Sequence, residues 1–72
     1  MVADIVKEID SSLSIHDFRM VSGPHHTNLI FDAVLPYEFK ISDAEFKDLM
    51  AKKIKEVDDS LYAVIDIDRS YI

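Results

Sequence analysis

The sequence predicts an α+β fold in which two helices pack on one face of a three-stranded sheet, in the order α-β-β-α-β. Three observations lead to this prediction: two segments have apolar residues at helical spacing, three segments alternate apolar with polar residues, and a capping box opens the second helical segment. A chain of 72 residues is too short for two separate cores, so residues 1–72 are expected to form a single domain.

The first element, residues 2–12, is predicted to be an amphipathic helix. Its apolar residues recur every three or four positions. They are Val2, Ile5, Val6, Ile9 and Leu13. Ser11 and Ser12 weaken the end of the helical pattern, and alternating sequence follows.

The next two elements are predicted to form an antiparallel hairpin. Residues 14–21 alternate in a way that places His16, Phe18 and Met20 on one face. Gly23 and Pro24 interrupt this strand, and residues 29–35 alternate again. The side chains of the second strand that are expected to meet the helices are Leu29, Phe31, Ala33 and Leu35.

The remaining elements are a second helix and a third strand. Ser42 and Glu45 form a capping box, and the apolar face that follows contains Phe46, Leu49, Met50, Ile54 and Val57. Residues 61–68 alternate as a strand, which residues 69–72 are expected to extend. Because the second helix is a crossover, the third strand can lie parallel to the second or reach the far side of the first.

The sheet face turned away from the helices contains most of the chemically informative residues. Alternation places Asp32, Asp66 and Asp68 there, and His16 joins them if the first strand is regular. Imidazole and carboxylates together suit Zn²⁺, Mn²⁺ and Fe²⁺, and a divalent cation relieves the repulsion between neighbouring carboxylates. The alternative interpretation is an ordinary solvent-facing side of a sheet, on which polar residues alternate.

The same face is also expected to expose apolar surface, which usually indicates an interface. The apolar side chains predicted on it are Phe18, Met20, Ile30, Val34, Tyr62 and Val64. The predicted partner is a second copy of the chain.

Composition argues against several other functions. The chain has 14 acidic and 8 basic residues, a net charge of −6, so nucleic acid is not an expected partner. It has no cysteine, which excludes disulfides and thiolate metal sites. A single glycine leaves no phosphate-binding loop, and no serine lies in a glycine-framed nucleophile turn. We therefore expect neither an enzyme nor a small-molecule substrate.

From Ser14 to Arg19 the chain reads Ser-Ile-His-Asp-Phe-Arg. Further on come Ser22-Gly23-Pro24, Val34-Leu35, Ile41-Ser42-Asp43-Ala44-Glu45 and Ala63-Val64-Ile65-Asp66-Ile67-Asp68. In these segments, which follow one another over nearly the whole chain, the sequence resembles the cytoplasmic C-terminal domain of cation diffusion facilitator (cation efflux) transporters. The His-Asp-Phe-Arg segment is the most specific part of the resemblance.

The resemblance implies a metallochaperone-like two-layer sandwich related to ferredoxin-like domains. It implies a homodimer in which metal between or beside the two copies brings them together. It also implies a place at the cytoplasmic face of the cell membrane, joined to the transmembrane domain of a parent transporter that exchanges a divalent cation for protons. The alternative is a free-standing ferredoxin-like module that binds a ligand or a metal.

The resemblance also implies a set of metal ligands. His16 matches a histidine ligand of the family and Asp68 matches an aspartate ligand, whereas Asp32, Glu45 and Asp66 fall where zinc-binding members have histidine. The expected ligand is a divalent ion, Zn²⁺, Mn²⁺, Fe²⁺ or Co²⁺, and the oxygen-rich set favours Mn²⁺ or Fe²⁺. Dimerisation without any metal is the alternative.

Overall fold

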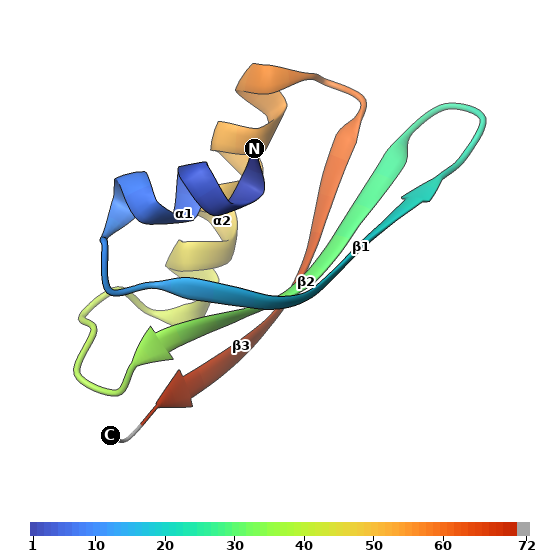
Figure 1. Ribbon diagram of the computed structural model, residues 1–72. Helices are drawn as coiled ribbons and strands as arrows, with labels where there is room; N and C mark the ends of the chain where they lie inside the picture. The colour runs from blue at the N-terminus through green and yellow to red at the C-terminus, as the bar shows by residue number, and fades with distance from the viewer. Residues whose placement is uncertain (71–72) are drawn as a thin grey trace.

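Two helices and three strands follow one another in the predicted order, and both helices lie on the same side of the sheet (Figure 1). The elements are α1 (Val2–Ile9), β1 (Ser14–Ser22), β2 (Thr27–Pro36), α2 (Asp43–Val57) and β3 (Leu61–Ser70). The structure is a computed structural model that describes residues 1–70. The predicted extension of the last strand holds as far as Ser70, and its remainder, Tyr71 and Ile72, lies outside the described residues.

The strand order is β1-β2-β3, with β1 antiparallel and β3 parallel to β2. This order decides between the two positions that the sequence left open for the third strand. Because α2 connects the two parallel strands, it crosses over the sheet and covers it on the same side as α1. β2 is thus the central strand, and its residues alternate between buried and half-buried positions.

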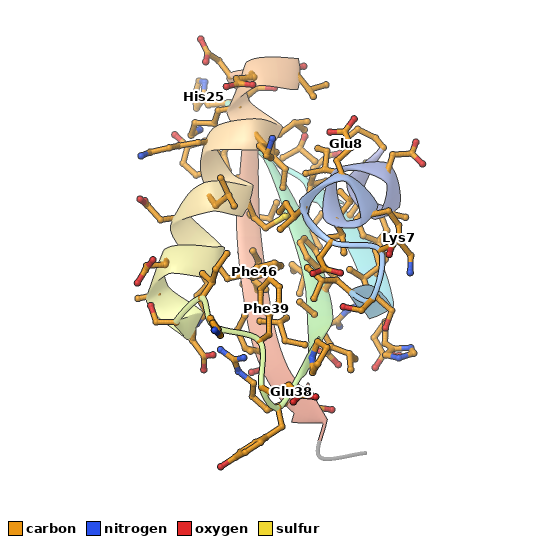
Figure 2. All side chains as sticks on the ribbon, turned by 90° about the vertical axis from the view of Figure 1, so that its left-hand side faces the viewer. Lys7, Glu8, His25, Glu38, Phe39 and Phe46 are labelled. Atoms are coloured by element: carbon orange, nitrogen blue, oxygen red, sulfur yellow. The ribbon has the colours of Figure 1, made fainter. Side chains whose placement is uncertain are left out.

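The core lies between the helices and the sheet. Its fully buried side chains come mainly from α1, β2 and α2 and include Val6, Leu29, Phe31, Leu35, Phe46, Met50 and Ile54. Figure 2 shows Phe39 and Phe46 between α2 and the strands, whereas Lys7 and Glu8 point outward from α1. The predicted apolar face of α2 is confirmed except at Val57, which is 58% exposed at the end of the helix.

Side-chain hydrogen bonds mark the start of α2 and the end of α1. At the start of α2, the Glu45 N–H donates to Ser42 Oγ over 3.1 Å, which confirms the capping box. α1 ends at Ile9, three residues before its predicted end, because Asp10 adopts an extended conformation and its carboxylate accepts bonds from the Ser12 N–H and hydroxyl. These two bonds hold the pKa of the Asp10 carboxyl below its usual range.

A β-bulge interrupts β1 and changes which residues face the helices. The register between β1 and β2 shifts between His16 and Arg19, and Asp17 has a positive φ of 54°. The expected placement of Phe18 and Met20 on the open face is therefore wrong. Met20 lies opposite the buried Leu29, and the Phe18 ring centroid is 6.2 Å from that of the buried Phe31.

Hydrogen bonds from Arg69 connect the end of β3 to the loop between β2 and α2. Its guanidinium donates to the carbonyl oxygens of Phe39 and Ile41 over 2.8 and 2.7 Å, and to Asp43 Oδ1 over 3.0 Å. A further bond reaches the Pro36 carbonyl. Within residues 1–70, no helix is long and apolar enough to cross a membrane.

Candidate functional site

His16, Asp32 and Asp66 form a row across all three strands on the open face of the sheet. Asp32 on β2 lies opposite His16 on β1 and opposite Asp66 on β3. Adjacent strands are about 4.8 Å apart, so the three side chains leave the sheet side by side. Asp68 follows Asp66 on the same face of β3 and lies opposite Val34. Four of the five expected ligands are thus brought to one face.

Glu45, the fifth expected ligand, lies on α2 and therefore on the other side of the sheet. Its carboxylate accepts a hydrogen bond from the Ser42 hydroxyl over 3.2 Å as part of the helix cap. Among residues 1–70, no three histidine, aspartate or glutamate side chains are grouped closely enough to hold a metal ion.

Asp17 is a member of the site that the sequence pattern did not predict. Regular alternation places it on the helix side, but the bulge turns it to the open face, where it lines the same hollow as Asp32 and raises the pKa of the Asp32 carboxyl. The sequence signal that could have indicated a bulge at Asp17 was its residue type, because Asp and Asn tolerate positive φ better than most residues. Nothing in the alternation of residues 14–21 marks the position of the bulge.

Asp32 is at the electrostatic centre of the cluster. The loss of hydration raises the pKa of its carboxyl most, and the negative charge of Asp17, the hydrogen bond to Asp17, and the charges of Asp66 and Asp68 raise it further. Within residues 1–70, no Lys or Arg forms an ion pair with these four carboxylates, although Arg19 lines the same hollow as Asp17 and Asp32. Asp32 therefore favours the uptake of a proton or the approach of a cation.

Apolar side chains surround the carboxylates. Val21, Tyr62 and Val64 are each about half exposed, at 52, 48 and 48%. Val21 takes the place on the open face that alternation had assigned to Met20. An open hollow beside this surface is lined by Asp17, Phe18, Arg19, Ile30 and Asp32. The expected apolar character of the face is retained, although the bulge changes which residues of β1 provide it.

The His25-His26 pair lies in the hairpin loop, away from the carboxylates. The His26 ring centroid is 4.7 Å from that of Tyr62, and Lys55 Nζ lies 3.7 Å from the Tyr62 ring centroid. Lys55 also donates to the carbonyl oxygens of Asp59 and Leu61. This group of contacts connects the hairpin, the end of α2 and the start of β3.

Fold and site together define a small two-layer α+β domain whose open sheet face combines a cluster of carboxylates with exposed apolar side chains. Comparison with protein families, with characterised proteins and with solved structures finds no match to this chain.

Proposed function

We propose that this chain is a regulatory self-association domain that responds to divalent cations through its open sheet face. The observation that carries the proposal is the row formed by His16, Asp32 and Asp66, in register across three strands and without an ion pair to Lys or Arg in residues 1–70. The raised pKa of Asp32 indicates that its negative charge is unfavourable in this setting. A bound cation would remove that cost.

A second copy of the chain fits this proposal in two respects. The row offers a few donors on an open surface, so the facing row of another copy would supply the ligands that one chain lacks. The half-exposed Val21, Tyr62 and Val64 would lose contact with water in the same interface. Without the cation, the facing carboxylates of two copies repel each other, which makes association dependent on the ion.

The resemblance to cation efflux domains extends the proposal to a parent protein. In that setting the domain lies at the cytoplasmic face of the membrane, beside a transmembrane domain that exports a divalent cation. The ion at the open face would then report the cytoplasmic concentration of the exported metal. The sequence encoded upstream in the same reading frame tests this extension: about six apolar segments support it, and their absence favours the free-standing module.

Metal titration of the purified domain tests the proposal directly. Mn²⁺, Zn²⁺, Co²⁺ or Ca²⁺ is added while amide NMR shifts and sedimentation velocity are recorded. At least one ion should shift the amides of residues 16, 32 and 66 and raise the sedimentation coefficient. Asp32→Asn and Asp66→Asn should weaken both effects, whereas Asp48→Asn, on α2, should leave them unchanged. Equal responses in all three variants, or none in the parent chain, would refute a site on this face.

A further inference from the structure

β3 is an edge strand whose outer side is unpaired. It pairs with β2 through a regular parallel register along its full length and with no other strand in residues 1–70. Between Ala63 and Asp68, no backbone group of the described chain forms a hydrogen bond on the side away from β2. Alternate residues of a strand point their N–H and C=O to the same edge, so half of these residues leave both groups free.

Fixed side chains mark both ends of this free edge. At the start of β3, Lys55 donates to the Leu61 carbonyl oxygen and covers the Tyr62 ring. At the end, the guanidinium of Arg69 is held by the loop between β2 and α2. The stretch between them spans about 20 Å, which is the length of a typical strand in a globular protein.

The two edges of the sheet are protected differently. β1 has a bulge at Asp17, which disrupts the row of backbone groups that another strand would need. β3 has no bulge, and no proline or lysine lies between Leu61 and Asp68. Its only charged side chains in that stretch are Asp66 and Asp68.

These two carboxylates select the kind of strand that would pair with β3. An acidic strand, including β3 of a second copy, would place further carboxylates beside them, and like charges on facing strands are destabilising. A strand with Lys or Arg on the open-face side would instead pair with them. On the helix side, Ala63 and Ile67 are half-buried and Ile65 is buried, so the added strand needs apolar residues there.

We propose that the β3 edge binds an extended segment of another protein by strand addition, and that this segment alternates basic with apolar residues. Backbone hydrogen bonds to residues 63–68 provide the binding, and the charge pattern provides the selectivity. The basic side chains lie on the open face beside Asp66 and Asp68, and the apolar side chains extend the core beneath α2. This inference needs neither a bound cation nor a second copy, so it stands or fails separately from the proposed function.

The test uses an acetylated and amidated heptapeptide, Lys-Val-Lys-Val-Lys-Val-Lys, added to the ¹⁵N-labelled domain in EDTA. Saturating binding should slow hydrogen exchange at alternate amides between 63 and 68, and the affinity should fall as salt is raised. Two control peptides separate the two parts of the proposal. Replacing every Lys by Glu removes charge complementarity, and replacing every Val by Pro removes three backbone donors and disfavours strand pairing but keeps all four Lys charges.

Matched variants locate the binding edge. Val64→Lys and Val21→Lys each add a charge at a half-exposed open-face position, one on each edge strand. Val64→Lys should weaken peptide binding about fivefold, as expected for like charges on adjacent strands, whereas Val21→Lys should change it less than about twofold. Far-ultraviolet circular dichroism verifies that both variants fold.

Several outcomes would overturn the inference. If the proline peptide bound as tightly as the original Lys-Val peptide, the attraction would come from charge alone. If the glutamate peptide bound as tightly, the contact would be apolar and not selective for charge. Exchange protection on β1 in place of β3 would mean that the wrong edge is assigned. Protection of β3 that increases with protein concentration in the absence of peptide would identify a second copy as the occupant.

Discussion

The carboxyl group of Asp17 lies close enough to that of Asp32 on the open face to raise the pKa of the Asp32 carboxyl, although it is His16, not Asp17, that lies opposite Asp32 in the register. Asp17 reaches this position because its positive φ turns the strand at the bulge. The nearby negative charge makes ionisation of Asp32 less favourable.

Asp32→Asn is expected to raise the free energy of unfolding at neutral pH. The pKa of the Asp32 carboxyl is higher in the folded state than in the unfolded state, so the protonated carboxyl favours folding below the ordinary aspartate pKa of about 3.9. This contribution to stability is lost as the pH rises through the raised pKa. The ionised Asp32 therefore destabilises the fold at pH 7, and asparagine removes that charge. Urea unfolding of variant and parent at pH 7 and pH 3 measures the effect, which should be larger at pH 7.

Asp58→Asn provides a control of opposite sign. The Ser60 N–H and hydroxyl hold the pKa of the Asp58 carboxyl below its usual range, so its stabilising contribution is present above about pH 3.9 and lost as the pH falls through the lowered pKa. This variant should lose stability at pH 7. If the two variants changed stability in the same direction at pH 7, the assigned electrostatic environments would be wrong.

Asp17→Val should destabilise the domain by about 1–2 kcal/mol relative to Asp17→Gly. A β-branched residue is strained at a positive φ, whereas glycine adopts it freely, and both substitutions remove the same carboxyl. Chemical denaturation of the two variants measures the difference. Similar stabilities would indicate that the bulge rearranges, and NMR contacts between β1 and β2 would then show a new register.

Arg69→Ala should lower the free energy of unfolding by about 2–3 kcal/mol, because it removes several charge-assisted hydrogen bonds from a partly buried guanidinium. Arg69→Lys should recover only part of the loss, since one ammonium group does not reach all of these acceptors. Lys52→Ala removes an exposed ion pair with Asp48 and should cost less than about 1 kcal/mol. Equal effects at positions 69 and 52 would contradict a structural role for Arg69.

Glu45→Gln should leave cation binding unchanged and alter stability by only a few tenths of a kcal/mol. The side-chain oxygen of glutamine still accepts the hydrogen bond from Ser42 within the helix cap. Ser42→Ala, in contrast, should cost about 1 kcal/mol because it leaves the Glu45 N–H without its acceptor. Loss of cation affinity in Glu45→Gln would place this residue in the metal site after all.

The order of elements and most of the core were predictable from the sequence. Each element has its own strong local pattern: helical spacing in α1, alternation in β2 and β3, and the capping box before α2. The candidate site was predicted in part, because alternation correctly places Asp32, Asp66 and Asp68 on one face. His16 also lies there, since it comes before the bulge.

The sequence by itself thus determined the α+β class, the buried faces of β2 and β3 and the acidity of the opposite face, because these properties depend on local periodicity. Only the tertiary structure decided the position of β3 beside β2, the bulge that brings Asp17 to Asp32, and the separation of Glu45 from the other carboxylates. Each of these depends on how distant segments pair or pack. Strand order and bulge position minimise the free energy of the whole sheet, and no pattern within a single strand records them.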